Sequence, residues 1–141
     1  MKTITFKDET YPKFQDAGFA AKFAFPYAKE VCKGWGYDIG CHLIQWAFPG
    51  AMPIDLTIPD EWDANNLPRD KPADYIFSSH CLEHVDNWVQ TLDYWMWHIR
   101  AGGTLFLYLP DFSQNYWRPW HNAKHKHVFT PEIIRAYLED R

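Results

Sequence analysis

The sequence contains little cysteine. Its 141 residues include three cysteines, Cys32, Cys41 and Cys81, and both the odd number and the irregular spacing argue against a disulfide framework. We therefore expect a protein of a reducing, cytoplasmic compartment. The N-terminus, Met-Lys-Thr-Ile-Thr-Phe-Lys-Asp, lacks the long apolar core of a signal peptide, which agrees with that expectation.

Long apolar runs and an excess of positive charge are also absent. No apolar run reaches the roughly 18 residues that a transmembrane helix needs, so we expect no membrane span. The formal net charge is −4, so a broad basic face for duplex nucleic acid is not expected. The most basic segment, residues 118–127, is short and suits a small acidic or phosphorylated substrate better.

Aromatic residues, in contrast, are abundant. They make up 18% of the chain, and eight of them are tryptophan. Large rings fill cores, and they also line pockets for flat or cationic ligands. The length predicts a single domain over residues 1–141, with a core that needs no disulfides or structural metal.

The apolar patterns alternate between strand and helix. After a short extended arm at residues 1–11, they predict a helix at 12–33, strands at 36–40 and 51–56, a short strand at 61–64, a strand at 74–79, a helix at 82–100, a strand at 104–109 and a helix from Thr130. Pro26 predicts a kink or two shorter helices, and Gly102–Gly103 a left-handed helix stop. About ten residues join the first two strands, so the helix between them is expected to be one turn. The fold class is therefore α/β, a Rossmann-like, mostly parallel sheet flanked by helices.

Polar residues follow each predicted strand in turn. The first strand ends in Asp38-Ile39-Gly40, the second in Asp55, the short one in Asp63-Ala64, and the third in residues 78–80. A glycine in the first turn lets a ligand approach the backbone, and an acid after the second strand can accept both ribose hydroxyls. A further Asp can accept from an adenine amino group. Together these residues predict a nucleoside site at the carboxyl edge of the sheet.

These segments resemble the motifs of class I S-adenosylmethionine-dependent methyltransferases, of the small type found in bacterial and phage genomes. Residues 36–41 resemble the first motif of that family, and residues 48–56 the second. Residues 63–68 resemble the adenine loop of the family. Residues 74–84 together with residues 100–105 resemble its fourth motif and the approach to the next strand. Residues 125–132 resemble a segment that often precedes the next helix. The resemblance covers about residues 12–138 and implies S-adenosylmethionine as the cofactor.

The resemblance also implies a role for individual residues. Asp55 would hold the ribose, Leu56 would pack on the adenine, and His80 would lie near the sulfonium. The full set of expected cofactor contacts is Gln15, Gly18, Asp38, Ile39, Gly40, Cys41, His42, Asp55, Leu56, Asp63, Ala64, Ser78, Ser79 and His80.

The sequence departs from the family pattern in two places. His42 stands where the first motif normally has its second glycine, so its side chain would either crowd the cofactor or contact its carboxylate. The two strands that usually follow the last helix are not expected, which leaves residues 104–109 as an exposed edge. Exposed edges tend to be covered by a partner, so we expect a homodimer.

Four histidines are candidates for a base that assists methyl transfer, and the sequence alone does not choose among them: His80, His84, His125 and His127. No Asp/Asn-Pro-Pro-Tyr/Phe run and no Pro-Cys pair occurs, which disfavours methylation of nucleic-acid bases. A small molecule or a sugar is therefore the expected acceptor.

Other chemistries remain as alternatives. His80, Cys81 and His84 lack a clear fourth metal ligand, so no metal is expected, and His121, His125 and His127 fit a solvated or substrate-binding loop better than a second metal site. No nucleophile elbow surrounds a cysteine. A nicotinamide oxidoreductase is disfavoured by the absent Gly-x-Gly-x-x-Gly run. A regulatory protein that binds the cofactor without turnover stays open.

Overall fold

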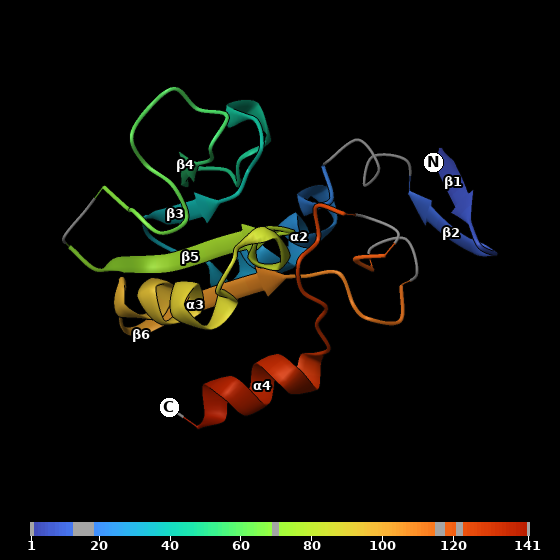
Figure 1. Cartoon of the computed structure of the whole chain (residues 1–141). Coiled ribbons are helices and arrows are strands. Elements are labelled where there is room, and N and C mark those ends of the chain that lie inside the picture. Colours follow the sequence, from blue (N-terminus) through green and yellow to red (C-terminus); the bar gives the residue numbers. More distant parts are fainter. Residues whose placement is uncertain (1, 13–18, 69–70, 115–117, 121–122, 141) are drawn as a thin grey trace.

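The computed structural model describes residues 2–12, 19–68, 71–114, 118–120 and 123–140 (Figure 1). The extended arm expected at the N-terminus is an antiparallel hairpin of β1 (Thr3–Phe6) and β2 (Glu9–Pro12). Lys7 and Asp8 between these strands have φ values of 47° and 67°. Two consecutive positive φ angles characterise the turn that suits the twist of a two-residue hairpin.

A four-stranded parallel sheet forms the centre of the fold. It contains β3 (Gly36–Ile39), β4 (Met52–Ile54), β5 (Ala73–Ser79) and β6 (Ile99–Tyr108) in the order β4-β3-β5-β6. The predicted parallel α/β fold with fewer strands than usual is thus confirmed. Pro53 lies in an edge strand, where its missing N–H does the least harm.

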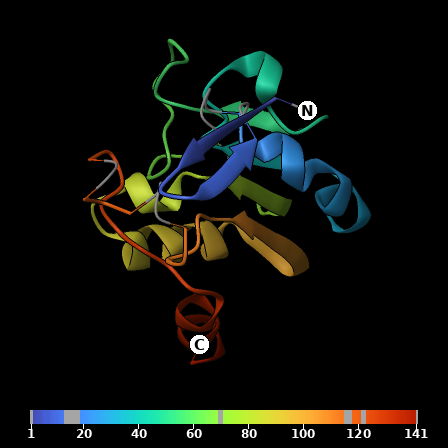
Figure 2. The same ribbon diagram turned by 90° about the vertical axis from the view of Figure 1, so that its right-hand side faces the viewer.

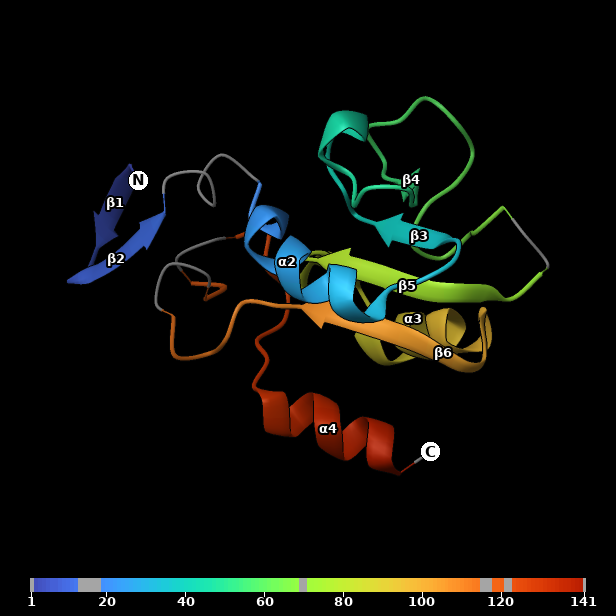
Figure 3. The same cartoon turned by 180° about the vertical axis from the view of Figure 1, so that it is seen from behind.

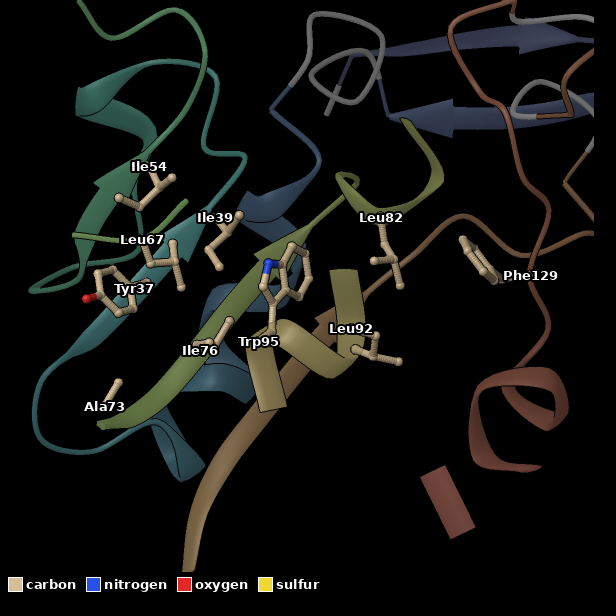
Figure 4. Packing of buried hydrophobic residues seen from close by; sticks show 10 residues of the cluster. All are labelled: Tyr37, Ile39, Ile54, Leu67, Ala73, Ile76, Leu82, Leu92, Trp95 and Phe129. Atoms are coloured by element: carbon tan, nitrogen blue, oxygen red, sulfur yellow. The ribbon is translucent and has the colours of Figure 1, made fainter. Parts of the chain in front are cut away.

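Helices cover the two faces of this sheet (Figures 1 and 3). α2 (Ala21–Val31) lies on one face and α3 (Trp88–Trp97) on the other. Successive side chains of β5 point to opposite faces, so Ile76 joins the core beside α3 while Phe77 joins the core beside α2. Trp95 is fully buried in the first of these cores (Figure 4).

The helix predicted at residues 82–100 is shorter and begins later. Residues Leu82–His84 form one turn of 3₁₀ helix, η2, and α3 begins only after Asn87, whose side chain accepts a hydrogen bond from the Gln90 N–H at 3.1 Å. The helix stop predicted at Gly102–Gly103 is also wrong, because β6 already begins at Ile99. Gly102, with a φ of +79°, lies inside this strand. A side chain at Gly103 would meet the carbonyl oxygen of Asp74, so this pair of glycines serves the strand rather than the helix.

Three further elements can be compared with the prediction. Of the helix expected at residues 12–33, residue 12 belongs to β2, and α2 runs from Ala21 through Pro26 as one helix. The prediction for residues 13–18 lies outside the described part. The strand expected at 61–64 is a single bridge between Asp63 and Asn66. The one-turn helix expected after β3 is η1 (Ile44–Trp46).

The C-terminal helix begins as the sequence predicts. α4 (Pro131–Glu139) follows Thr130, whose side chain accepts a hydrogen bond from the Ile133 N–H. β6 is an edge strand of the sheet, as expected, while the homodimer inferred from that edge stays a prediction. In the described part of the chain, the helices are too short or too polar to cross a membrane.

The start of α3 can be tested by removing its cap. Replacing Asn87 with Ala leaves the first N–H groups of the helix without a side-chain acceptor, so we expect a loss of about 1 kcal/mol in the free energy of unfolding. Urea denaturation measures this loss. Asn87→Asp keeps an acceptor oxygen and should stay close to the wild type; an equal loss in both variants would contradict the capping role.

Candidate functional site

A cavity of about 940 Å³ lies over the carboxyl ends of β3, β4 and β5. Figure 2 looks onto this edge of the sheet, with the β1–β2 hairpin on the same side. Ten of the predicted cofactor contacts line the cavity: Ile39, Gly40, Cys41, His42, Asp55, Leu56, Asp63, Ala64, Ser79 and His80. The structure therefore brings together residues that are up to 41 positions apart along the chain, as the order of the strand ends implied.

Of the four other predicted contacts, two do not line the cavity and two lie outside the described residues. Asp38 is buried beneath it, where its Oδ2 accepts a hydrogen bond from the Phe48 N–H at 2.7 Å. Ser78 is fully buried and donates to the Ile39 carbonyl at 2.8 Å, which ties β5 to β3. Gln15 and Gly18 fall in residues 13–18, outside the described part, so all four roles stay predictions.

Asp55 joins the loops that follow β3 and β4. Its Oδ2 accepts from the His42 N–H at 2.7 Å, and its Oδ1 accepts from the Thr57 N–H at 2.9 Å. The Thr57 hydroxyl donates in turn to the His42 carbonyl. An ionised carboxylate has about four acceptor positions, so about two remain for a pair of ribose hydroxyls.

His42 occupies a backbone conformation that favours glycine. Its φ is +67°, which explains why the related motif normally has glycine at this place. The ring is exposed and lies 5.6 Å from the ring of Trp46, which stacks on Phe19 at 4.8 Å between centroids. Neither of the two effects predicted for the His42 side chain is tested by these contacts.

Gly40 permits a close approach between two strand ends. Its φ is +86°, and a Cβ placed there would lie 2.5 Å from the Cβ of Cys81 and 2.8 Å from its sulfur. Cys81 thus serves packing. Burial, with a smaller contribution from Glu83, raises the pKa of its thiol far above the usual value. Burial first, and then Asp38 and Asp55, raise the pKa of Cys41 to about 12, so both thiols are neutral and poor nucleophiles.

Three of the four histidines predicted as bases meet at the other end of the cavity. His80, His84 and His125 line it, whereas His127 does not and instead donates from Nε2 to the Val85 carbonyl at 2.6 Å. Burial, followed by the nearby His125 and His84, lowers the pKa of His80 to about 3. Burial also lowers the pKa of His84. Both rings are therefore neutral at physiological pH.

Glu83 was missed by the sequence reasoning; it does not line the cavity but lies beside two of the histidines that do. Its side chain is fully buried, and burial raises its pKa to about 8. The carboxyl oxygen Oε1 lies 3.4 Å from His84 Nε2 and 3.9 Å from His80 Nδ1. The Lys126 N–H donates to the Glu83 carbonyl at 2.7 Å, which holds the segment with His125 against η2. The run His80-Cys-Leu-Glu83-His84 was the available signal, since it places all three side chains within one turn.

The close approach at Gly40 can be separated from its backbone angle. Gly50 has a similar φ of +84° but has open space where a Cβ would be. We expect Gly50→Ala to lose about 1 kcal/mol of unfolding free energy from the angle alone, and Gly40→Ala to lose about 1–3 kcal/mol more from the clash with Cys81. Urea denaturation compares the two, and equal losses would contradict the account.

Asp38 predicts a pH dependence of stability. Burial, opposed by the bond from Phe48, raises the pKa of its carboxyl to about 7 in the folded protein. Between about pH 4 and pH 7 the unfolded chain ionises this group while the folded protein keeps it protonated, so stability falls as the pH rises, by at most about 1.4 kcal/mol per unit. Asp38→Asn removes this contribution and keeps an acceptor oxygen.

The measurement is chemical denaturation of both proteins across this pH range. The stability of the variant relative to the wild type should increase from pH 4 to pH 7 and then level off. Parallel curves would show that the Asp38 carboxyl is ionised in the folded protein at ordinary pH.

Comparison with known proteins agrees with the geometry. A protein family described as "Methyltransferase domain" matches residues 17–141. Searches of curated proteins and of solved structures give no match. The family match covers the sheet, the cavity and the histidine cluster. The chain therefore belongs to the methyltransferase domain family and is an S-adenosylmethionine-dependent methyltransferase.

Proposed function

We propose that the protein transfers the methyl group of S-adenosylmethionine to a hydroxyl or amine of a small molecule or a sugar. The observation that carries this proposal is one continuous cavity with two chemically different ends. Its volume of about 940 Å³ is at the upper end of the range for ligand pockets, which supports a site for cofactor and acceptor together.

The end formed by the loops after β3 and β4 suits the adenosine of the cofactor. Leu56 is 86% exposed beside Asp55, so an adenine ring stacked on it would bury apolar surface that otherwise faces water. Asp63 and Ala64 face the same space. The Ala64 carbonyl accepts a hydrogen bond from Trp95 Nε1 at 2.7 Å, so the adenine loop is anchored to the core of the domain.

The opposite end suits a polar acceptor. His80, His84 and His125 line it together with Lys124 and Lys126. Lys126 is paired with Asp86, so Lys124 is the lysine that favours an acceptor with an acidic or phosphate group. The imidazoles can hydrogen-bond to a hydroxyl or an amine.

Methyl transfer requires mainly that the cofactor and the acceptor are aligned. A lone pair of the acceptor forms a bond to the methyl carbon while the carbon–sulfur bond breaks, and its electron pair returns to the sulfur. The acceptor proton leaves to a base or to water. Correct positioning supplies roughly 7–11 kcal/mol of the barrier reduction, and assistance to proton removal contributes about 10²–10⁴-fold.

Thermal shift of the purified protein tests the cofactor. At 100 times the dissociation constant, S-adenosylmethionine or S-adenosylhomocysteine should stabilise the protein by about 2.7 kcal/mol, a rise in Tm of several degrees. NAD should cause no shift. Because Asp55 also holds two backbone N–H groups, both Asp55→Ala and the isosteric Asp55→Asn should be measured, and both should weaken binding. If neither sulfur cofactor shifts the wild type, the proposal is wrong.

Turnover is tested by detecting S-adenosylhomocysteine with a panel of sugars and small acidic hydroxyl compounds. A productive acceptor should give product with the wild type. His84→Ala should lower kcat by about 10²–10⁴-fold while the thermal shift with S-adenosylhomocysteine persists. A variant with full turnover would show that the histidine end does not contact the acceptor.

A further inference from the structure

Glu83 carries a carboxyl group in a position that ordinary packing does not explain. Its side chain is fully buried, and neither carboxyl oxygen has a hydrogen-bond partner among the residues that the structure describes. Burying a carboxylate costs several kcal/mol unless something compensates the charge. Buried polar groups without partners are rare in proteins, and a bound ion is one of the few explanations for them.

Two imidazoles converge on this carboxyl group. His84 Nε2 lies 3.4 Å from Glu83 Oε1, and the His84 and His125 rings meet edge to face with centroids 4.6 Å apart. One ligand atom from each of the three residues lies within 4.8 Å of the other two. The Nδ1–H of His84 donates to the Lys124 carbonyl at 2.7 Å, which leaves the lone pair on Nε2, the atom that faces Glu83. A backbone carbonyl in this role is typical behind metal-binding histidines.

We infer that Glu83, His84 and His125 bind a divalent transition-metal ion at the acceptor end of the cavity. The sequence alone predicts no metal site, because His80, Cys81 and His84 lack a clear fourth ligand. The structure supplies a different set: Cys81 packs against Gly40, while Glu83 and His125 join His84.

The donor atoms indicate the kind of metal. Two imidazole nitrogens and one carboxylate oxygen suit Zn²⁺, Fe²⁺ or Mn²⁺, whereas Mg²⁺ and Ca²⁺ prefer oxygen ligands alone. Bonds of about 2.0–2.2 Å place ligand atoms roughly 3–4 Å apart. The 3.4 Å pair already fits this spacing, and all three ligand atoms lie within 4.8 Å of one another, so a small adjustment of the side chains suffices. Three protein ligands leave positions for the acceptor, with His80 Nδ1 nearby at 3.9 Å from Glu83 Oε1.

Two lysines, Lys124 and Lys126, add positive charge at this end of the cavity, and one of them is compensated. Lys126 is paired with Asp86 through a hydrogen bond between Nζ and Oδ1, so its charge is compensated next to the site. The metal in turn would compensate the Glu83 carboxylate. This arrangement gives the buried carboxyl group a counter-charge that the described protein atoms do not provide.

The role of the metal rests on the proposed methyl transfer. A metal at this position would bind an acceptor hydroxyl as a Lewis acid and lower its pKa, so that the proton leaves to solvent water. The hydroxyl oxygen then forms the bond to the methyl carbon, and the sulfur keeps the electron pair of the broken bond. The metal undergoes no redox change.

Calorimetric titration of the EDTA-treated, dialysed protein with Zn²⁺ alone, and separately with Co²⁺, tests the inference without cofactor or acceptor. We expect one ion per chain, and visible Co²⁺ absorption bands that report nitrogen and oxygen ligation. Glu83→Gln, which keeps the shape of the side chain and should fold because it removes a buried acid, should weaken binding by more than roughly tenfold. His84→Ala and His125→Ala should do the same.

His42→Gly is the matched control, since it removes a histidine from the same cavity at the cofactor end and relieves a positive φ angle. It should bind the metal like the wild type. No binding by the wild type, or the same affinity in Glu83→Gln and His84→Ala, would overturn the inference. This readout is independent of the thermal shift with S-adenosylmethionine, so the metal site and the methyl-transfer proposal can fail separately.

Discussion

The parallel pairing of β5 with both β3 and β6 is the constraint on which the rest of the structure depends. Phe77 pairs with Asp38 on one side and with Phe106 on the other, so the three strands end at one edge. The Ser78 hydroxyl, bonded to the Ile39 carbonyl, fixes that alignment inside the sheet. Because the strands are parallel, every loop that leaves this edge faces the same space, and the cavity follows from the sheet.

The two ends of the cavity are held by different means. At the cofactor end a single carboxylate, Asp55, binds the backbone of the loops after β3 and β4, so a ligand meets two loops that are already fixed. At the acceptor end the segment around Lys126 returns from far along the chain and is bonded to the backbone of Glu83. His80, which directly follows β5, lies at this acceptor end.

Local patterns in the sequence predicted what local physics decides. The apolar runs located β3, β5 and β6, and Thr130 and Pro131 located the start of α4. The late start of α3 was missed because periodic apolar residues continue upstream of the Asn87 cap, where tertiary packing holds η2 instead. The close approach of Gly40 to Cys81 and the proximity of Glu83 to His125 were not predictable, since each depends on segments that only the folded sheet brings together.

The central claim is that the cofactor spans the strand ends with its adenosine at Asp55 and its sulfur toward His80. A crystal structure of the complex with S-adenosylhomocysteine tests it most directly. We expect the ribose hydroxyls on the Asp55 carboxylate, the adenine against Leu56 and the loop at Asp63, and the sulfur facing the histidine end. A nucleoside bound outside this cavity, or bound in the reverse direction with its adenine among the histidines, would contradict it.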